Sequence, residues 1–161
     1  MVIEFAGLWT YSGTNDRLPL SQLPDRLGEH VHGELQVLVN GRRLPSLGYF
    51  GVDDVCFNEW VHELHTVREL LEAGTSAVYV YDEGEQGQPA YEFRRVDNTV
   101  LVSVIEGSGG GSADADWQGV PCLLTDLAAA IDRFEEALRA QLGREAADVG
   151  LRWMDHVIRG Q

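Results

Sequence analysis

The sequence contains no lysine, and each of its 12 basic residues is an arginine. This absence excludes every reaction that needs a lysine amine, including Schiff-base catalysis and phosphate binding by a P-loop or protein-kinase lysine. An arginine-only composition is typical of genomes rich in G and C, so we expect a bacterial source.

Long apolar runs are also absent. No stretch reaches the roughly 18 consecutive apolar residues that a membrane-spanning helix needs. The opening residues, MVIEFAGLW, lack the basic region that begins a signal peptide. We therefore expect a cytoplasmic protein without membrane contact. Its cysteines, Cys56 and Cys122, are expected to be free thiols, although the sequence alone leaves a disulfide open.

Positive charge is scarce, since 26 acids against 12 arginines give a net charge of −14. Most of this charge lies in residues 53–92, which hold ten acids and one arginine. Such a surface would repel nucleic acid but would attract a basic protein. The alternative is an acidic surface that serves solubility alone.

The segment Asp53–Gly74 is the strongest predicted helix. Asp53 or Asp54 is expected to cap its first turn, and Gly74 to end it. Apolar residues recur in it at steps of three or four and are expected to form one buried face: Phe57, Trp60, Val61, Leu64, Val67 and Leu71. The opposite face carries acids and histidines and is expected to meet solvent.

Alternating residues predict strands on either side of this helix. Asn40-Gly41 predicts a hairpin turn, because both residue types tolerate a positive φ. Two further amphipathic helices are expected at 126–142 and 145–159. The predicted strands cover 2–11, 34–39, 42–50, 76–81, 90–96, 99–105 and 120–124.

This order of elements predicts an α+β fold. We expect a mostly antiparallel β-sheet, with one helix inserted after the first strands and two C-terminal helices packed on it. Residues 1–161 are expected to form a single domain with a flexible glycine-rich loop at 107–116. Whether residues 1–52 pair with the later strands is left open.

No motif predicts catalysis or a cofactor. Glu59, His62 and His65 are spaced by three, which differs from the i, i+4 histidine pair of zinc proteases. His30 and His32 would share one face of a strand with a nearby glutamate, but the further ligands of a known metal motif do not follow. The sequence therefore predicts neither a metal site nor a cofactor.

The chain resembles the immunity proteins of bacterial polymorphic toxin systems. The resemblance rests on a helix that ends in ELLEAG before a strand and on the hairpin AYEFRRVDNTVLVSV, and it covers residues 53–142. It implies a non-enzymatic protein that binds and blocks a toxin, often a basic one. No catalytic residue is implied.

We therefore predict an acidic protein-binding module that attracts a basic partner. The alternative is a small-molecule or metal-binding protein, or an enzyme, with a site between the sheet and the C-terminal helices. A deep polar pocket would favour that alternative. The residues expected to contact a protein partner lie on the central helix and in the loop after the next strand: Glu59, Glu63, Asp82, Glu83 and Glu85.

Overall fold

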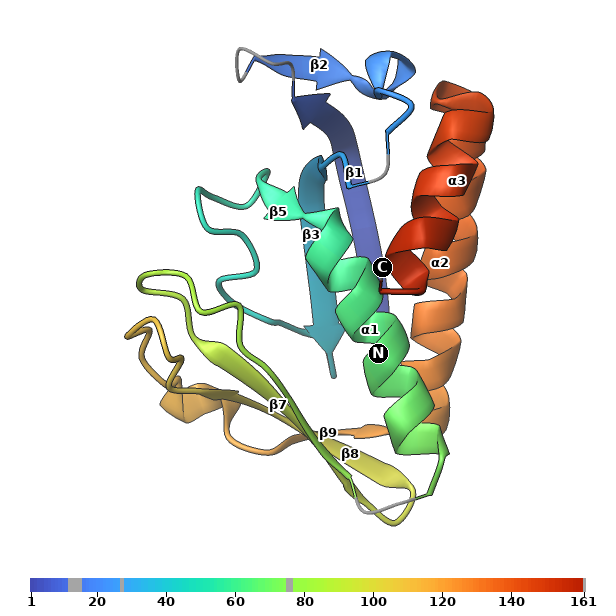
Figure 1. Ribbon diagram of the computed structural model, residues 1–161. Coiled ribbons are helices and arrows are strands. Elements are labelled where there is room, and N and C mark those ends of the chain that lie inside the picture. The colour runs from blue at the N-terminus through green and yellow to red at the C-terminus, as the bar shows by residue number, and fades with distance from the viewer. Residues whose placement is uncertain (12–15, 27, 75–76, 161) are drawn as a thin grey trace.

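The computed structural model describes residues 1–11, 16–26, 28–74 and 77–160. Within these residues the chain forms two antiparallel sheets and three α-helices (Figure 1). This confirms the predicted α+β class, with one helix after the first strands and two at the C-terminal end.

The first sheet has the strand order β2-β1-β3-β4, and β5 also pairs with β3. Its strands are β1 (Val2–Tyr11), β2 (Arg17–Pro19), β3 (Val31–Val39), β4 (Arg42–Arg43) and β5 (Val55–Cys56). β4 and β5 pair with opposite ends of β3. The predicted turn at Asn40-Gly41 is confirmed, with φ values of 51° and 75°.

The predicted return strand 42–50 is wrong beyond Arg43. Pro45 has no N–H to donate to a ladder, and Ser46 adopts a φ of 58°. The chain therefore leaves the sheet and forms a long loop before it returns as β5.

The second sheet has the strand order β6-β7-β8-β9. Its strands are β6 (Val78–Tyr81), β7 (Ala90–Val96), β8 (Thr99–Ile105) and β9 (Val120–Leu123). The predicted bounds of β7 and β8 are confirmed. Within the described part of the chain, the N-terminal strands form a sheet of their own and do not pair with these later strands.

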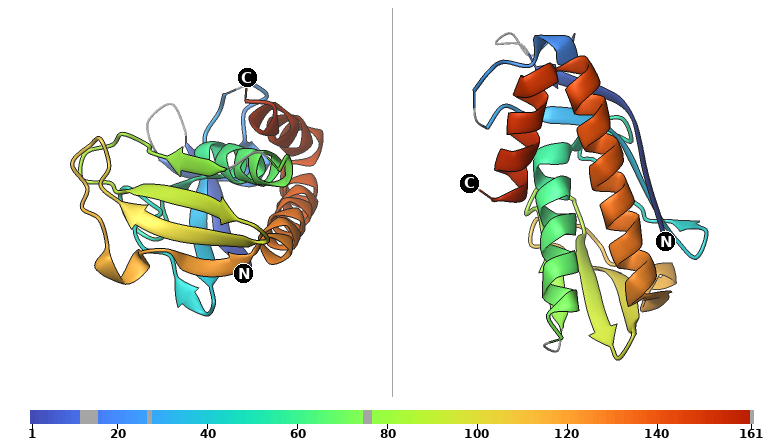
Figure 2. Two further views of the ribbon diagram at one scale, coloured as in Figure 1. Left: turned by 90° about the horizontal axis from the view of Figure 1, so that it is seen from below. Right: turned by 90° about the vertical axis from the view of Figure 1, so that its right-hand side faces the viewer.

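Three helices lie side by side, as Figure 2 shows, and two of them contact the first sheet. They are α1 (Phe57–Glu72), α2 (Leu124–Glu145) and α3 (Ala147–Ile158). Short 3-10 turns occur at η1 (Leu20–Gln22) and η2 (Ala115–Trp117). α2 does not end at Gly143 as expected but continues to Glu145.

Buried side chains from both sheets and all three helices form one hydrophobic cluster. α1 lies at its centre and contacts β3, β6, α2 and α3. Each apolar residue predicted for the buried face of α1 is buried. The free thiols predicted for Cys56 and Cys122 are also confirmed.

The start of α1 differs from the prediction. Cys56 occupies the N-cap position, and no side chain caps the helix there. The preceding residues pair with β3 instead, so the helix begins later than expected. The two aspartates have other contacts: Asp53 binds Arg17 at 2.7 Å, and Asp54 lies 2.7 Å from His32.

The glycine-rich segment 107–116 folds back towards the loop after β6. The Gly87 N–H donates to the Gly109 carbonyl oxygen at 3.0 Å, and the Ser108 N–H donates to Asp82 at 2.8 Å. The two loops therefore support one another. Flexibility of this segment stays a prediction.

Candidate functional site

A cleft of about 570 Å³ lies where the two sheets approach each other near the start of α1. Its walls come from the beginning of β3, the loop between β4 and β5, the first two turns of α1, and β6 with the loop that follows it. In Figure 1 these two loops project from the same side of the molecule. None of the lining residues belongs to α2 or α3, so this cleft is not where the alternative prediction placed a site.

All the residues predicted to bind a partner line this cleft: Glu59, Glu63, Asp82, Glu83 and Glu85. Two of these acids have internal partners. Asp82 accepts the N–H groups of Gly84 and Ser108, and Glu63 accepts the Tyr79 hydroxyl.

Three of the acids remain without such a partner. Glu59, Glu83 and Glu85 form no hydrogen bond or ion pair through their carboxylates with the residues that the structure describes. The described residues that line the cleft include no arginine. Among the described residues, no arginine of the lining therefore neutralises the negative charge of the cleft.

Burial adds to the cost of this charge. Desolvation raises the pKa of Glu83, and the neighbouring carboxylates of Glu59 and Glu85 raise that pKa further. Desolvation also raises the pKa of Glu63, although the Tyr79 hydroxyl that donates to it acts in the opposite direction. A cation placed between these groups would remove much of the repulsion.

The wall of the cleft also contains a buried hydroxyl group. Tyr81 is only 6% exposed, and its Oη atom has no hydrogen-bond partner among the described residues. Trp60 packs edge-on against it, with ring centroids 5.1 Å apart, and holds the ring in place. An unsatisfied buried hydroxyl is unusual in a folded protein, but this oxygen is enclosed by the protein and is not exposed to the cleft.

Two aromatic side chains form part of the rim. Tyr49 is 39% exposed and Phe50 is 79% exposed, and their rings meet edge to face at 4.5 Å. Both residues lie within the predicted strand 42–50, so their place on the rim of the cleft was not predicted. A usable signal was present, because Gly48 and Gly51 flank the pair and favour a loop. A Cβ atom on Gly48 would lie 2.2 Å from the Gly51 carbonyl oxygen.

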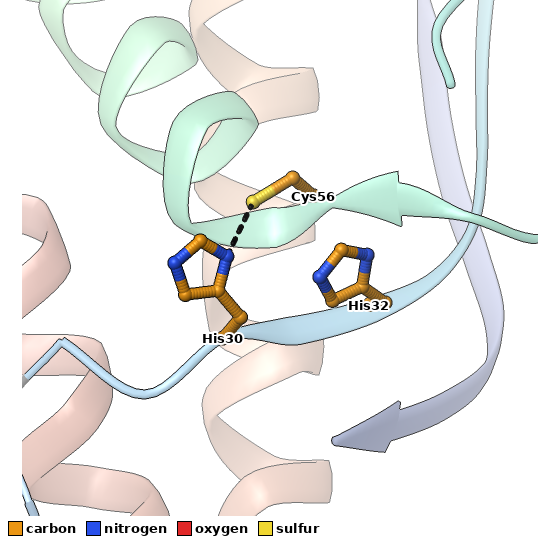
Figure 3. A group of neighbouring side chains, drawn as sticks. All are labelled: His30, His32 and Cys56. Atoms are coloured by element: carbon orange, nitrogen blue, oxygen red, sulfur yellow. Dashed lines mark hydrogen bonds between the residues drawn. The ribbon is translucent and has the colours of Figure 1, made fainter. Parts of the chain in front are cut away.

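A different set of side chains lines the other end of the cleft. His30, His32 and Cys56 come together there, and one potential ligand atom from each of them lies within 4.8 Å of the other two (Figure 3). From the sequence, the two histidines were expected to share a strand face with Glu34 instead. That carboxylate accepts a hydrogen bond from Gln36 at 2.7 Å and lies 3.7 Å from Arg43.

The second group of histidines does not belong to the cleft. His65 contacts Glu69 at 3.4 Å and Glu135 at 3.0 Å, so it links α1 to α2. His62 does not line the cleft either, and it lies near Gly160 close to the C-terminal end.

Comparison of the chain with protein-family models, with curated proteins and with solved structures gave no match. The immunity-protein resemblance therefore stays a prediction. Among the described residues, no helix combines the length and the apolar character needed to cross a membrane.

Proposed function

We propose that this protein is a non-enzymatic binding module whose acidic cleft receives a cationic segment of a partner protein. The observation that carries the proposal is the convergence of the predicted acids on one cleft of about 570 Å³ that has no arginine in its lining. A guanidinium or ammonium group would neutralise this charge where it is only partly exposed to water.

The parts of the cleft have separate roles in this proposal. The acids Glu59 and Glu85, which are exposed, attract the basic partner and set its orientation. Phe50 supplies apolar contact area on the rim, where exposed aromatic residues often serve as anchors. Neutralisation of a basic toxin is the form of this function that the sequence resemblance favours.

The volume of the cleft favours one second candidate. Small-molecule pockets commonly measure about 300–1,000 Å³, so a small cationic metabolite would also fit. In that case a free guanidinium compound would bind as tightly as a peptide does. A protein partner predicts instead that most of the affinity needs the peptide chain around the charged group.

A matched pair of charge reversals tests the site. The double variant Glu59→Arg/Glu85→Arg changes two exposed acids of the cleft. The control Glu72→Arg/Glu136→Arg changes two exposed acids at the end of α1 and on α2, so both variants have the same net charge. Binding of a fluorescent arginine-rich peptide is measured by anisotropy at low and high salt, with arginine amide as the small-molecule comparison.

We expect the cleft variant to weaken peptide binding by at least about tenfold, and the control by about twofold or less. Equal losses in both variants would show that net charge alone attracts the peptide, and the cleft would then not be the binding site. The same pair of variants applies to capture of a basic protein from extract of the native cells.

A further inference from the structure

Three side chains that line the cleft and can bind a metal ion lie close together. The Cys56 sulfur lies 3.7 Å from His30 Nδ1. Together with a nitrogen of His32, these atoms lie within 4.8 Å of one another. Figure 3 shows the two imidazole rings side by side next to the cysteine; His30 directly precedes β3, His32 lies in β3, and Cys56 ends β5.

The backbone holds these residues in place. His32 is the direct partner of Cys56 in the antiparallel pairing of β3 with β5, which puts their side chains on the same face. His30 comes two residues earlier and shares that face. The Thr10 hydroxyl donates to the His30 carbonyl oxygen at 2.8 Å, and the Asn58 amide hydrogen-bonds the backbone on both sides of His30 at 3.0 Å.

The spacing of these atoms fits a particular coordination chemistry. Zn²⁺ takes sulfur at about 2.3 Å and nitrogen at about 2.0–2.1 Å, so a tetrahedral centre separates the two ligand atoms by about 3.6 Å. The separation between Cys56 and His30 is already 3.7 Å. A potential ligand atom of His32 lies within 4.8 Å of both, so the metal ion would have to draw the three atoms closer together.

We propose that His30, His32 and Cys56 bind one divalent transition-metal ion, Zn²⁺, and leave a fourth coordination position open towards the cleft. Imidazole and thiolate are ligands that zinc prefers, and three protein ligands with one open position form a common zinc arrangement. This proposal differs from the expectation from sequence, in which Cys56 was not connected with the histidines.

Asp54 provides independent support for the site. Its side chain is buried, with 6% exposure, and its Oδ1 atom lies 2.7 Å from His32 Nδ1. The separation of the two atoms is that of a hydrogen bond, but the imidazole and the carboxylate are not aligned for one. A turn of the imidazole ring would align them. Carboxylates in this position orient the histidine ligands of metal sites.

The contact leaves the other ring nitrogen, Nε2, for the metal. In Figure 3 the Nε2 side of the His32 ring faces the other two residues. This atom is buried and has no hydrogen-bond partner among the residues that the structure describes. Trp9 stacks on the ring with centroids 4.8 Å apart and limits its movement. A bound metal ion would satisfy a nitrogen that otherwise loses its hydration without compensation.

The zinc site does not depend on the proposed protein-binding function. It uses side chains other than the five acids, and its test needs no partner. Failure of one proposal would leave the other standing.

Zinc binding by the purified full chain is the first test. The protein is treated with a chelator, dialysed against Zn²⁺ and analysed for bound metal. We expect one ion per chain in the native protein and in Cys122→Ser, and a loss of at least about 100-fold in affinity in Cys56→Ser. Asp54→Asn should weaken binding by about 10–100-fold.

Cobalt provides a spectroscopic test of the same ligands. Co²⁺ bound by a cysteine thiolate shows a near-ultraviolet charge-transfer band, which should appear in the native protein and in Cys122→Ser but not in Cys56→Ser. His30→Ala changes an exposed position and should also remove bound metal while the circular dichroism spectrum stays native. The absence of bound zinc in the native protein, or its retention in both Cys56→Ser and His30→Ala, would overturn the proposal.

Discussion

Repulsion among the carboxylates of the cleft should lower the free energy of unfolding of the isolated protein. Glu83 is the residue at which this effect is best measured. Glu83 is half-buried, and desolvation raises its pKa, with further increases from Glu59 and Glu85. The carboxyl group therefore holds its proton to a higher pH in the folded chain than in the unfolded one. Its ionisation at neutral pH works against folding.

The expected gain from Glu83→Gln follows from this linkage. Each unit by which folding raises a carboxyl pKa removes about 1.4 kcal/mol of stability at neutral pH. Glu83 keeps part of its solvent contact, which screens the repulsion, so we expect the variant to gain about 0.5–1 kcal/mol. For a chain of 161 residues, this corresponds to a rise in Tm of about 1–4 °C.

The pH dependence makes the prediction specific. Below the unfolded-state pKa of about 4.3, Glu83 is protonated in both states and the native protein loses nothing through it. The stabilising effect of Glu83→Gln should therefore be small near pH 4 and should grow as the pH rises through the folded-state pKa of Glu83. Tyr81, Tyr91 and Cys56 also interact with the Glu83 charge, so their ionisation at alkaline pH sets the upper limit of the useful range.

Thermal unfolding at several pH values measures the effect, with a chelator present so that bound metal makes no contribution. Glu136→Gln serves as the control, because Glu136 is exposed on α2 and away from the cleft. A Glu83→Gln variant that is less stable than the native protein at pH 7, or whose gain does not shrink towards pH 4, would refute the reasoning. The same variant should bind the arginine-rich peptide more weakly, so stability and binding should change in opposite directions.

Substitutions at two positions test the framework that holds the cleft. Asn58→Ala removes the amide that accepts from the Val31 N–H and donates to the Glu29 carbonyl oxygen, and should cost about 1–3 kcal/mol. Asn58→Asp keeps the acceptor and should cost less. Gly33→Ala would place a Cβ 2.9 Å from the Ala6 carbonyl oxygen and should cost about 1–3 kcal/mol. Urea unfolding followed by tryptophan fluorescence measures all three, and a native-like midpoint in Asn58→Ala or Gly33→Ala would contradict its prediction.

Local patterns in the sequence predicted the regular elements well. The buried face of α1 could be read from its residues because helical spacing alone decides which side chains share a face. The bounds of β7 and β8 were predicted because the tight turn at Asp97-Asn98 fixes their register, and Asp97 does adopt a φ of 54°. These features depend on residues that are close together in the chain.

Features that depend on distant partners were not predictable in this way. The start of α1 was misplaced because Val55–Cys56 pairs with β3, and the sequence gives no sign of that pairing. Asp53 and Asp54 have the residue type of helix caps, yet each has a contact with a residue from an earlier strand. A strong local preference gave way to contacts across the fold.

The same distinction explains which parts of the candidate site were found. The acids lie within one stretch of sequence, so a count of charge along the chain located them before the fold was known. Of the proposed zinc ligands, His30 and Cys56 lie 26 residues apart, and only the pairing of β5 with β3 brings them together. Without Cys56, the two histidines form an incomplete metal-binding motif, so the sequence alone did not predict a site there.

The position of α1 accounts for the two kinds of chemistry in one cleft. The helix begins directly after Cys56, so the pairing that places this thiol beside the histidines also fixes where the first turn starts. Glu59 and Glu63 follow about one and two turns later. Both lie outside the buried face of the helix and line the cleft. A shift of the helix start by one residue would rotate both acids by about 100° and would remove them from the cleft. The strand pairing that creates the proposed metal site therefore also aims the acids, and the two ends of the cleft share one structural origin.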